Sequence, residues 1–160
     1  MACCDLRPLD SCVVQPYVSG SMQLSDLLAW LLGQTGPSDV TVTTFSTSEA
    51  FIRRIALLRS AGLVRSATLI CDLRASRKTE CLMQFAAGAF DHVLLARNHS
   101  KVVIVRGGCI SAAVVTSQNQ TRGDRFEAGV VTTDSFTVES LSAAIDDIIS
   151  CSVSADVHVR

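Results

Sequence analysis

The sequence lacks any long hydrophobic run. None of its apolar stretches reaches the roughly 18 residues that a helix needs to cross a bilayer. The longest, LSDLLAWLL and ALLRSAGLV, are interrupted by charge and are typical of helices that face a protein core. The amino terminus contains acids and has no apolar segment directly behind a basic start, which argues against a secretory signal. We therefore expect a cytoplasmic protein that contacts no membrane.

The sequence also lacks the spacing of metal ligands. It contains seven cysteines, but none stands in a CxxC or Cys/His arrangement that holds zinc. Cys3 and Cys4 are adjacent, which suits neither a simple disulfide nor a metal finger. Clustered carboxylates are missing as well. We expect reduced thiols in a cytosolic protein, and neither a metal nor another cofactor.

Acidic residues are scarce in the middle of the chain. The segment from Arg53 to Arg125 contains twelve basic and four acidic residues, a net charge of +8, although the whole chain carries −1. With 48% hydrophobic and 18% charged residues the chain is nevertheless globular. A positive segment favours an anionic and polymeric ligand such as nucleic acid, and scattered solvated arginines are the alternative interpretation.

Hydrophobic periodicity divides most of the chain into helices and strands. The first twenty residues show no clear period, and we expect an irregular lead-in or an edge strand there. Ser46 and Glu49 have the spacing of a capping box, and Gly62 stands where a C-terminal cap is expected. Helices are predicted over 24–33, 46–62, 77–88 and 135–150, and strands over 39–45, 66–73, 91–96, 101–107, 109–117 and 126–134.

Helices alternate with strands in the first half of the chain, whereas the later strands crowd together. This order predicts an α/β fold in which helices flank a mixed sheet, formed by a single domain over residues 1–160. The closing helix has Phe136, Leu141, Ile145 and Ile148 as its apolar members, and the tail over 151–160 is undecided between irregular and regular structure.

Two polar clusters stand beside the crowded strands. His99 and Lys101 are two residues apart at the start of one strand, so they project to the same face. Ser117 and Asn119 have the same spacing at the end of the next strand. A hairpin that turns at 107–108, a Gly-Gly pair, brings residues near 99–101 opposite residues near 114–117. We expect the two clusters to meet at one end of the sheet.

The motif HSK, followed by an apolar strand, TSQN and a downstream glutamate, resembles the phospholipase D superfamily. The family signature is H-x-K, an aspartate after four more residues, and then Ser-x-Asn. The motif match covers about residues 94–133, and the order of strands and helices over about 39–149 is similar to one repeat of that fold. The stretch is especially similar to the family's single-motif members. The sequence departs from the family at Arg106, which stands in place of the aspartate.

The resemblance implies a phosphodiesterase, and the basic segment favours a nuclease over a lipase. His99 would attack phosphorus and form a covalent phosphohistidine. Lys101, Ser117 and Asn119 would bind the non-bridging oxygens, and Glu127 would accept a hydrogen bond from the other ring nitrogen of His99. Positive side chains would neutralise the phosphate, so no metal is needed. Arg122 and Arg125 would line a groove that binds a polyanion, and the alternative interpretation is that they belong to a solvated loop.

Such a reaction needs a second histidine to protonate the leaving oxygen. The chain has only His92 and His158 besides His99, and neither stands in another H-x-K. The resemblance implies a two-fold homodimer in which both copies of His99 share one site at the interface. The alternatives are a catalytically impaired module that binds nucleic acid or a protein partner, motivated by Arg106, and a degenerate copy that only self-associates.

Overall fold

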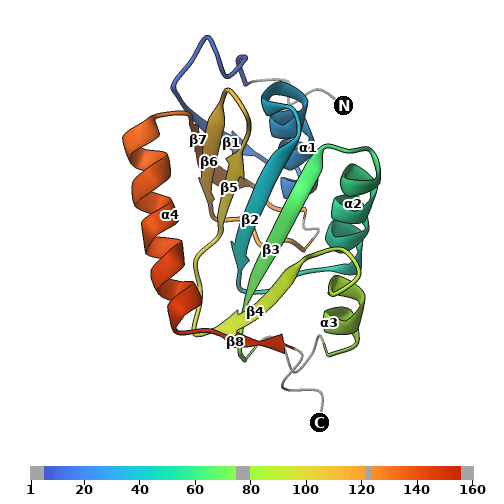
Figure 1. Cartoon of the computed structure of the whole chain (residues 1–160). Helices are drawn as coiled ribbons and strands as arrows, with labels where there is room; N and C mark the ends of the chain where they lie inside the picture. The colour runs from blue at the N-terminus through green and yellow to red at the C-terminus, as the bar shows by residue number, and fades with distance from the viewer. Residues whose placement is uncertain (1–5, 75–79, 122–123, 156–160) are drawn as a thin grey trace.

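The computed structural model describes residues 6–74, 80–121 and 124–155. In these ranges eight strands form one sheet, in the order β1-β7-β6-β5-β2-β3-β4-β8 (Figure 1). The strands are β1 (Val14–Ser19), β2 (Ser38–Thr44), β3 (Val64–Asp72), β4 (His92–Ala96), β5 (Val102–Arg106), β6 (Ser111–Thr116), β7 (Glu127–Thr132) and β8 (Val153–Ser154). The helices are α1 (Leu24–Thr35), α2 (Glu49–Ser60), α3 (Glu80–Ala86) and α4 (Ser135–Ser150).

The sheet has a parallel centre and antiparallel flanks. Strands β2, β3 and β4 run parallel, and α2 and α3 form the connections between them. The pairs β2–β5, β5–β6, β6–β7, β1–β7 and β4–β8 are antiparallel. Short hairpin loops suffice for antiparallel neighbours, whereas parallel neighbours need a crossover helix. The predicted α/β class with a mixed sheet is confirmed.

Helices cover the two faces of the sheet unequally. Helices α1, α2 and α3 lie on one face, and α4 lies alone on the other (Figure 1). The larger core fills the first interface, where Leu28, Ile52 and Leu69 are fully buried. The smaller core lies under α4, where Ile145 packs with Ile104. No helix in the described ranges has both the length and the apolar character to cross a membrane.

The ends of α2 are set by a polar cap and a glycine. Ser48, not Ser46, is the N-terminal cap, because its hydroxyl accepts a hydrogen bond from the Phe51 N–H at 3.3 Å. The predicted capping box at Ser46 was therefore wrong by two residues, because the helix begins at Glu49, directly after Ser48. Gly62 follows the helix with a φ of +74°, as the predicted C-terminal cap requires.

The chain ends add edge strands, and α4 packs three of its four predicted apolar members, Leu141, Ile145 and Ile148, on the sheet. The lead-in contains β1, which pairs with β7 at one edge of the sheet, and the tail contains β8, which pairs with β4 at the other. Phe136 was predicted as a core residue of the closing helix, but its side chain is 80% exposed. Val138, two residues later, is buried instead, because α4 presents that position to the sheet.

The β5–β6 hairpin forms where the Gly-Gly pair predicted it. The Gly107 N–H donates to the Ile110 carbonyl at 3.1 Å. A Cβ at Gly107 would lie 2.6 Å from that carbonyl oxygen and 2.7 Å from the Thr35 carbonyl oxygen, so only glycine fits. The resulting register pairs Val102 with Val115 and joins the Thr116 N–H to the Lys101 carbonyl at 3.0 Å. The segments after β6 and before β5 therefore meet at one end of the sheet, as predicted.

A second glycine supports the edge strand β1. Gly129 on β7 lies opposite Tyr17, and a Cβ there would be 2.6 Å from the tyrosine Cζ. The Tyr17 ring cannot withdraw easily, because it is buried and its hydroxyl donates to Thr116 at 3.0 Å. We expect Gly129→Ala to lower the free energy of unfolding by about 2 kcal/mol in urea denaturation. Gly108→Ala is the matched control, because a Cβ there meets nothing within 4 Å, and equal midpoints for the two variants would contradict the argument.

Candidate active site

The loop between β4 and β5 carries the predicted histidine and lysine side by side. Lys101 Nζ lies 3.2 Å from His99 Nδ1 and donates to the His99 carbonyl at 2.8 Å. The His99 side chain is exposed, and its ring packs against Phe45 with 5.0 Å between the ring centroids and 50° between the planes. An accessible imidazole thus stands beside an ammonium group at the end of the sheet.

The Lys101 ammonium is in an environment that disfavours its charge. Partial burial lowers the pKa of Lys101, and the negative charge of Glu127 opposes that shift. Glu127 begins β7, two strands away from β5 in the sheet. Its charge acting on Lys101 indicates that the predicted carboxylate faces the H-x-K loop.

A second polar cluster joins the end of β6 to the start of β7. The Ser117 hydroxyl donates to the Glu127 carboxylate and accepts from the Ala128 N–H at 3.1 Å. The Ser117 N–H donates in turn to the Ala128 carbonyl at 2.9 Å. These bonds fix Ser117 and Glu127 relative to each other across adjacent strands. Because Thr116 is bonded to Lys101, this cluster lies next to the histidine and lysine.

Two predicted contacts are not made in this chain. Glu127 accepts a hydrogen bond from Ser117, while the described contacts of the His99 ring are with Lys101 and Phe45. Within the described ranges, no hydrogen bond ties Asn119 to those groups, and its buried Oδ1 has no partner. The roles assigned to these residues stay predictions.

Only one of the two arginines of the predicted groove lies within the described residues. Arg125 is exposed before β7. Arg122 lies outside the described residues. A groove that both arginines line therefore also stays a prediction.

A buried asparagine that the sequence analysis did not single out holds the H-x-K loop. Asn98 is 4% exposed, and its Oδ1 accepts from the Ser100 N–H at 3.0 Å and from the Ser100 hydroxyl at 2.5 Å. Its Nδ2 donates to the Thr44 carbonyl at 3.3 Å, and its N–H donates to Asp72 at 3.1 Å. Ser100 also bonds the Thr43 hydroxyl at 2.8 Å. These hydrogen bonds fix the loop to β2 and β3.

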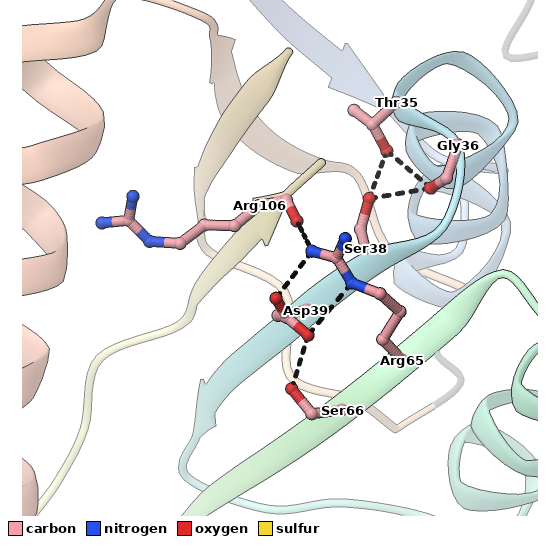
Figure 2. A network of polar contacts seen from close by, with 7 residues as sticks. All are labelled: Thr35, Gly36, Ser38, Asp39, Arg65, Ser66 and Arg106. Carbon is pink, nitrogen blue, oxygen red and sulfur yellow. Dashed lines mark hydrogen bonds and ion pairs between the residues drawn. The ribbon is translucent and has the colours of Figure 1, made fainter. Parts of the chain in front are cut away.

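Arg106, the departure from the family motif, lies at the far end of β5 from the site. Its guanidinium makes two hydrogen bonds to Glu139 on α4, at 2.8 and 2.9 Å, and one to Ser142 at 2.8 Å. Figure 2 shows its carbonyl oxygen accepting from Arg65 while its side chain extends the other way. Asp39 pairs with the same Arg65, at 2.7 Å (Figure 2). Arg106 therefore anchors α4 and does not touch the His99 loop in any described contact.

The Arg106–Glu139 pair predicts the effect of restoring an acid at position 106. We expect Arg106→Asp to lower the Tm, because two carboxylates then face each other, and Glu139→Arg in addition to restore part of the loss. The Arg106 hydrogen bond holds the pKa of Glu139 below its usual range, so the pair stabilises the fold above that range and loses its effect as the pH falls through the lowered pKa. Thermal melts from pH 7 down to pH 3 should show the difference between wild type and Arg106→Asp shrinking. A double variant no more stable than Arg106→Asp at pH 7 would contradict this account.

Ion pairs neutralise part of the positive segment. Four of its arginines pair with carboxylates, three of which come from outside the segment. The pairs are Arg53–Glu49, Arg59–Asp91, Arg65–Asp39 and Arg106–Glu139. The field expected from the sequence count is accordingly weaker in the folded chain.

Known proteins share the fold of this chain. No protein-family model matches the sequence, and no curated protein matches it. The structure is similar to Nuc from Salmonella typhimurium, a phospholipase D family member, with a TM-score of 0.66 and 16% identity over 88% of this chain and 96% of that one. It is also similar to NucT from Helicobacter pylori, with a TM-score of 0.63 and 17% identity over 88% and 99% of the two chains. An archaeal chromatin protein has a TM-score of 0.58 and 10% identity, over 88% of this chain and 53% of its own. The chain therefore has the phospholipase D-like fold.

Proposed function

We propose that the chain is a phosphodiesterase that cleaves nucleic acid without a metal ion, through a covalent phosphohistidine on His99. The observation that carries this proposal is the contact between the His99 ring and the Lys101 ammonium, with Ser117 and Glu127 on the adjoining strand ends. An exposed imidazole supplies a nucleophile at neutral pH, and the ammonium supplies the charge that a phosphate needs. The fold shared with a phospholipase D family member supports the same chemistry.

The reaction proceeds in two displacements. A nitrogen of the neutral His99 ring attacks phosphorus, and the bond from phosphorus to the leaving oxygen breaks. Lys101, Ser117 and Asn119 stabilise the non-bridging oxygens in the transition state. His99 of the partner subunit protonates the leaving oxygen and then removes a proton from water, whose oxygen displaces the first imidazole from phosphorus. Both rings return to their starting protonation states.

Substrate binding changes the hydrogen bonds of the His99 ring. An ammonium group only donates, so at 3.2 Å the His99 Nδ1 acts as the acceptor and Nε2 carries the ring proton. A bound phosphate attracts the Lys101 ammonium away from Nδ1. The ring proton then moves to Nδ1, where Glu127 is the acceptor, and the lone pair on Nε2 becomes free to attack. Glu127 thereby acts on the ring only after the substrate has bound.

The second histidine comes from a second copy that covers an exposed apolar part of the sheet. We define this apolar sheet face by Val14, Pro16, Val18, Val115, Ala128 and Val130. The register places Val115 beside Val130, and Val130 beside Pro16, so the side chains are contiguous across β6, β7 and β1. Val18 is 71% exposed, because α4 covers the other part of this face. Exposed apolar patches of this kind mark protein interfaces.

The apolar sheet face adjoins the candidate active site. Ala128 is next to Glu127 on β7, with its side chain on the other face of the sheet, and Val115 is two residues before Ser117. A two-fold axis near these residues brings two copies of the H-x-K loop together, which is the arrangement the reaction requires. The apolar sheet face thus supports a homodimer with the motif at its interface.

A module that binds nucleic acid without cleaving it is the second candidate. The described contacts favour it, because Glu127 accepts from Ser117 while the described contacts of the His99 ring are with Lys101 and Phe45. The archaeal chromatin protein that shares the fold is described as binding DNA. In this module Arg125 and Lys101 would contact phosphates, and affinity would fall with salt.

The test is turnover without metal. We expect the purified protein to cleave single-stranded DNA, RNA or a simple aryl phosphodiester in excess EDTA at pH 7. Rapid quenching with a phosphorus-labelled substrate should trap label on the protein that is stable to alkali and labile to acid, as a phosphoramidate is. Intact substrates in all three assays would overturn the proposal, and salt-dependent DNA binding without cleavage would establish the second candidate.

A further inference from the structure

A pocket opens beside the candidate active site. It has a volume of about 510 Å³ and lies between the first turns of α1 and α2 and the segment that follows β6. Asn119 lines it, and so do the apolar side chains of Leu24 and Phe51. This volume is within the range of small-molecule sites, about 300–1,000 Å³.

The pocket contains a buried amide with no partner. Gln120 lines the pocket and is only 3% exposed, and neither Oε1 nor Nε2 of its side chain has a hydrogen-bond partner within the described ranges. The Oδ1 of Asn119 is unpartnered in the same way. A buried amide that makes no hydrogen bond destabilises the fold, so a residue of this kind calls for a ligand or water that completes it.

The backbone around this amide is fixed before any ligand binds. The Gln120 N–H donates to the Ser46 carbonyl at 3.3 Å, and the Ser48 hydroxyl donates to the Gln120 carbonyl at 2.7 Å. Ser48 is also the cap of α2. The Gln120 backbone is therefore held against the start of α2, in the wall of the pocket.

The charged side chains that line the pocket within the described residues are acidic. Asp26 and Asp124 are its charged lining residues, and neither lysine nor arginine lines it within the described part of the chain. Carboxylates accept hydrogen bonds, and a carboxamide both accepts and donates. These groups favour a ligand with N–H donors and at least one acceptor.

We infer that this pocket accepts a nucleobase that carries an exocyclic amino group, from the nucleotide whose phosphate lies at Lys101. This inference rests on the proposed function and specifies its substrate. Ser117, at the phosphate end, and Asn119, in the pocket wall, are two residues apart, about 7 Å in extended chain. A base and its own phosphate span this distance. Glutamine and asparagine side chains pair with base edges, and unstacked bases are recognised this way in single strands.

The test compares oligonucleotides that differ in one base. One carries adenine at the nucleotide of a single cleavable phosphate, a second carries thymine there, and a third is abasic. We expect wild-type protein to cleave the adenine substrate about tenfold faster than the abasic one, with thymine between them, since one good amide–base pair contributes this much. Gln120→Met should reduce the adenine-to-abasic ratio to about one, since its apolar side chain makes no base contact, without lowering the Tm. Asp26→Asn should lower the preference for adenine over thymine, and Asp147→Asn, exposed on α4, is the control.

The outcomes separate this inference from the proposed function. If none of the substrates is cleaved, the phosphodiesterase proposal fails. Affinities for the same oligonucleotides, measured by fluorescence anisotropy, still show whether the pocket prefers adenine to an abasic site. Equal rates and equal affinities for the adenine and abasic substrates would overturn the base pocket. A lower Tm for Gln120→Met with an unchanged ratio would make Gln120 a structural residue and would also overturn it. Preferred cleavage of glycerophosphoethanolamine, lost in Asp26→Asn, would replace the base by an amine headgroup.

Discussion

The His99→Ala variant should lose phosphodiester turnover by about 10⁴-fold or more, the scale seen when a covalent nucleophile is removed. The physical reason is that the His99 imidazole supplies the nucleophilic lone pair of the H-x-K loop at neutral pH, whereas the neighbouring Lys101 ammonium has none. The measurement is initial rate on a simple phosphodiester in EDTA, with enzyme labelling by the phosphorus-labelled substrate as the second readout. Both signals should disappear together.

His92→Ala is the matched control for this variant. His92 begins β4 and is exposed, on a strand that leads into the same loop. Its removal should leave the rate within a factor of about two, as expected for a surface substitution away from the site. Turnover that survives in His99→Ala, or that falls equally in His92→Ala, would remove His99 from the mechanism.

Dimer disruption should have an effect of similar size. Val18→Asp places a charge on the apolar sheet face, where Val18 is 71% exposed. A charge buried in an interface without a partner opposes association. We expect sedimentation to change from dimer to monomer at micromolar protein, and turnover to fall by about 10²–10⁴-fold, because the leaving oxygen loses its acid.

A second substitution and a mixing experiment test the same interface. Leu57→Asp is the control, since Leu57 is 63% exposed on α2, over the opposite face of the sheet. In an equimolar, re-equilibrated mixture of wild type and His99→Ala, only the dimers with two intact subunits should act, which leaves about one quarter of the activity. An active monomer, or a mixture that retains one half of the activity, would show that each chain works alone.

Strong periodic patterns predicted most of the fold. The helix over 135–150 was predicted with the limits that the structure gives, and the six predicted strands agree with β2 to β7 to within about two residues. The predictions that failed depended on tertiary contacts. Either Ser46 or Ser48 suits a helix cap by composition, and the choice between them follows from where the segment after β6 docks against Ser48. Phe136 is the exception, because it lies nine residues, or about two and a half helical turns, before Ile145 and so points away from the face of α4 that packs on the sheet.

The candidate site was predictable to the extent that its residues are linked by strand register. His99, Lys101, Ser117 and Glu127 follow or precede neighbouring strands, so their meeting could be argued from the hairpin. The contacts of Arg106 with α4 could not be predicted, because its partner Glu139 is 33 residues away in the sequence and lies on a helix whose packing leaves no local pattern. The same limit applies to Asn98, whose partners lie on β2 and β3. Pairing also explains why a charge count over 53–125 overstated the positive field.

Because helices cover the two faces of the sheet unequally, folding of the chain and formation of the dimer are separate equilibria, although the two are often linked in oligomers. The larger core is closed by α1, α2 and α3 within a single chain, so a solitary copy already has the burial it needs for a cooperative transition. Below the dissociation constant of the dimer, protein concentration should then govern activity while leaving the unfolding midpoint nearly constant. A cell could adjust the output of such a protein through its expression level alone, with no change in conformation.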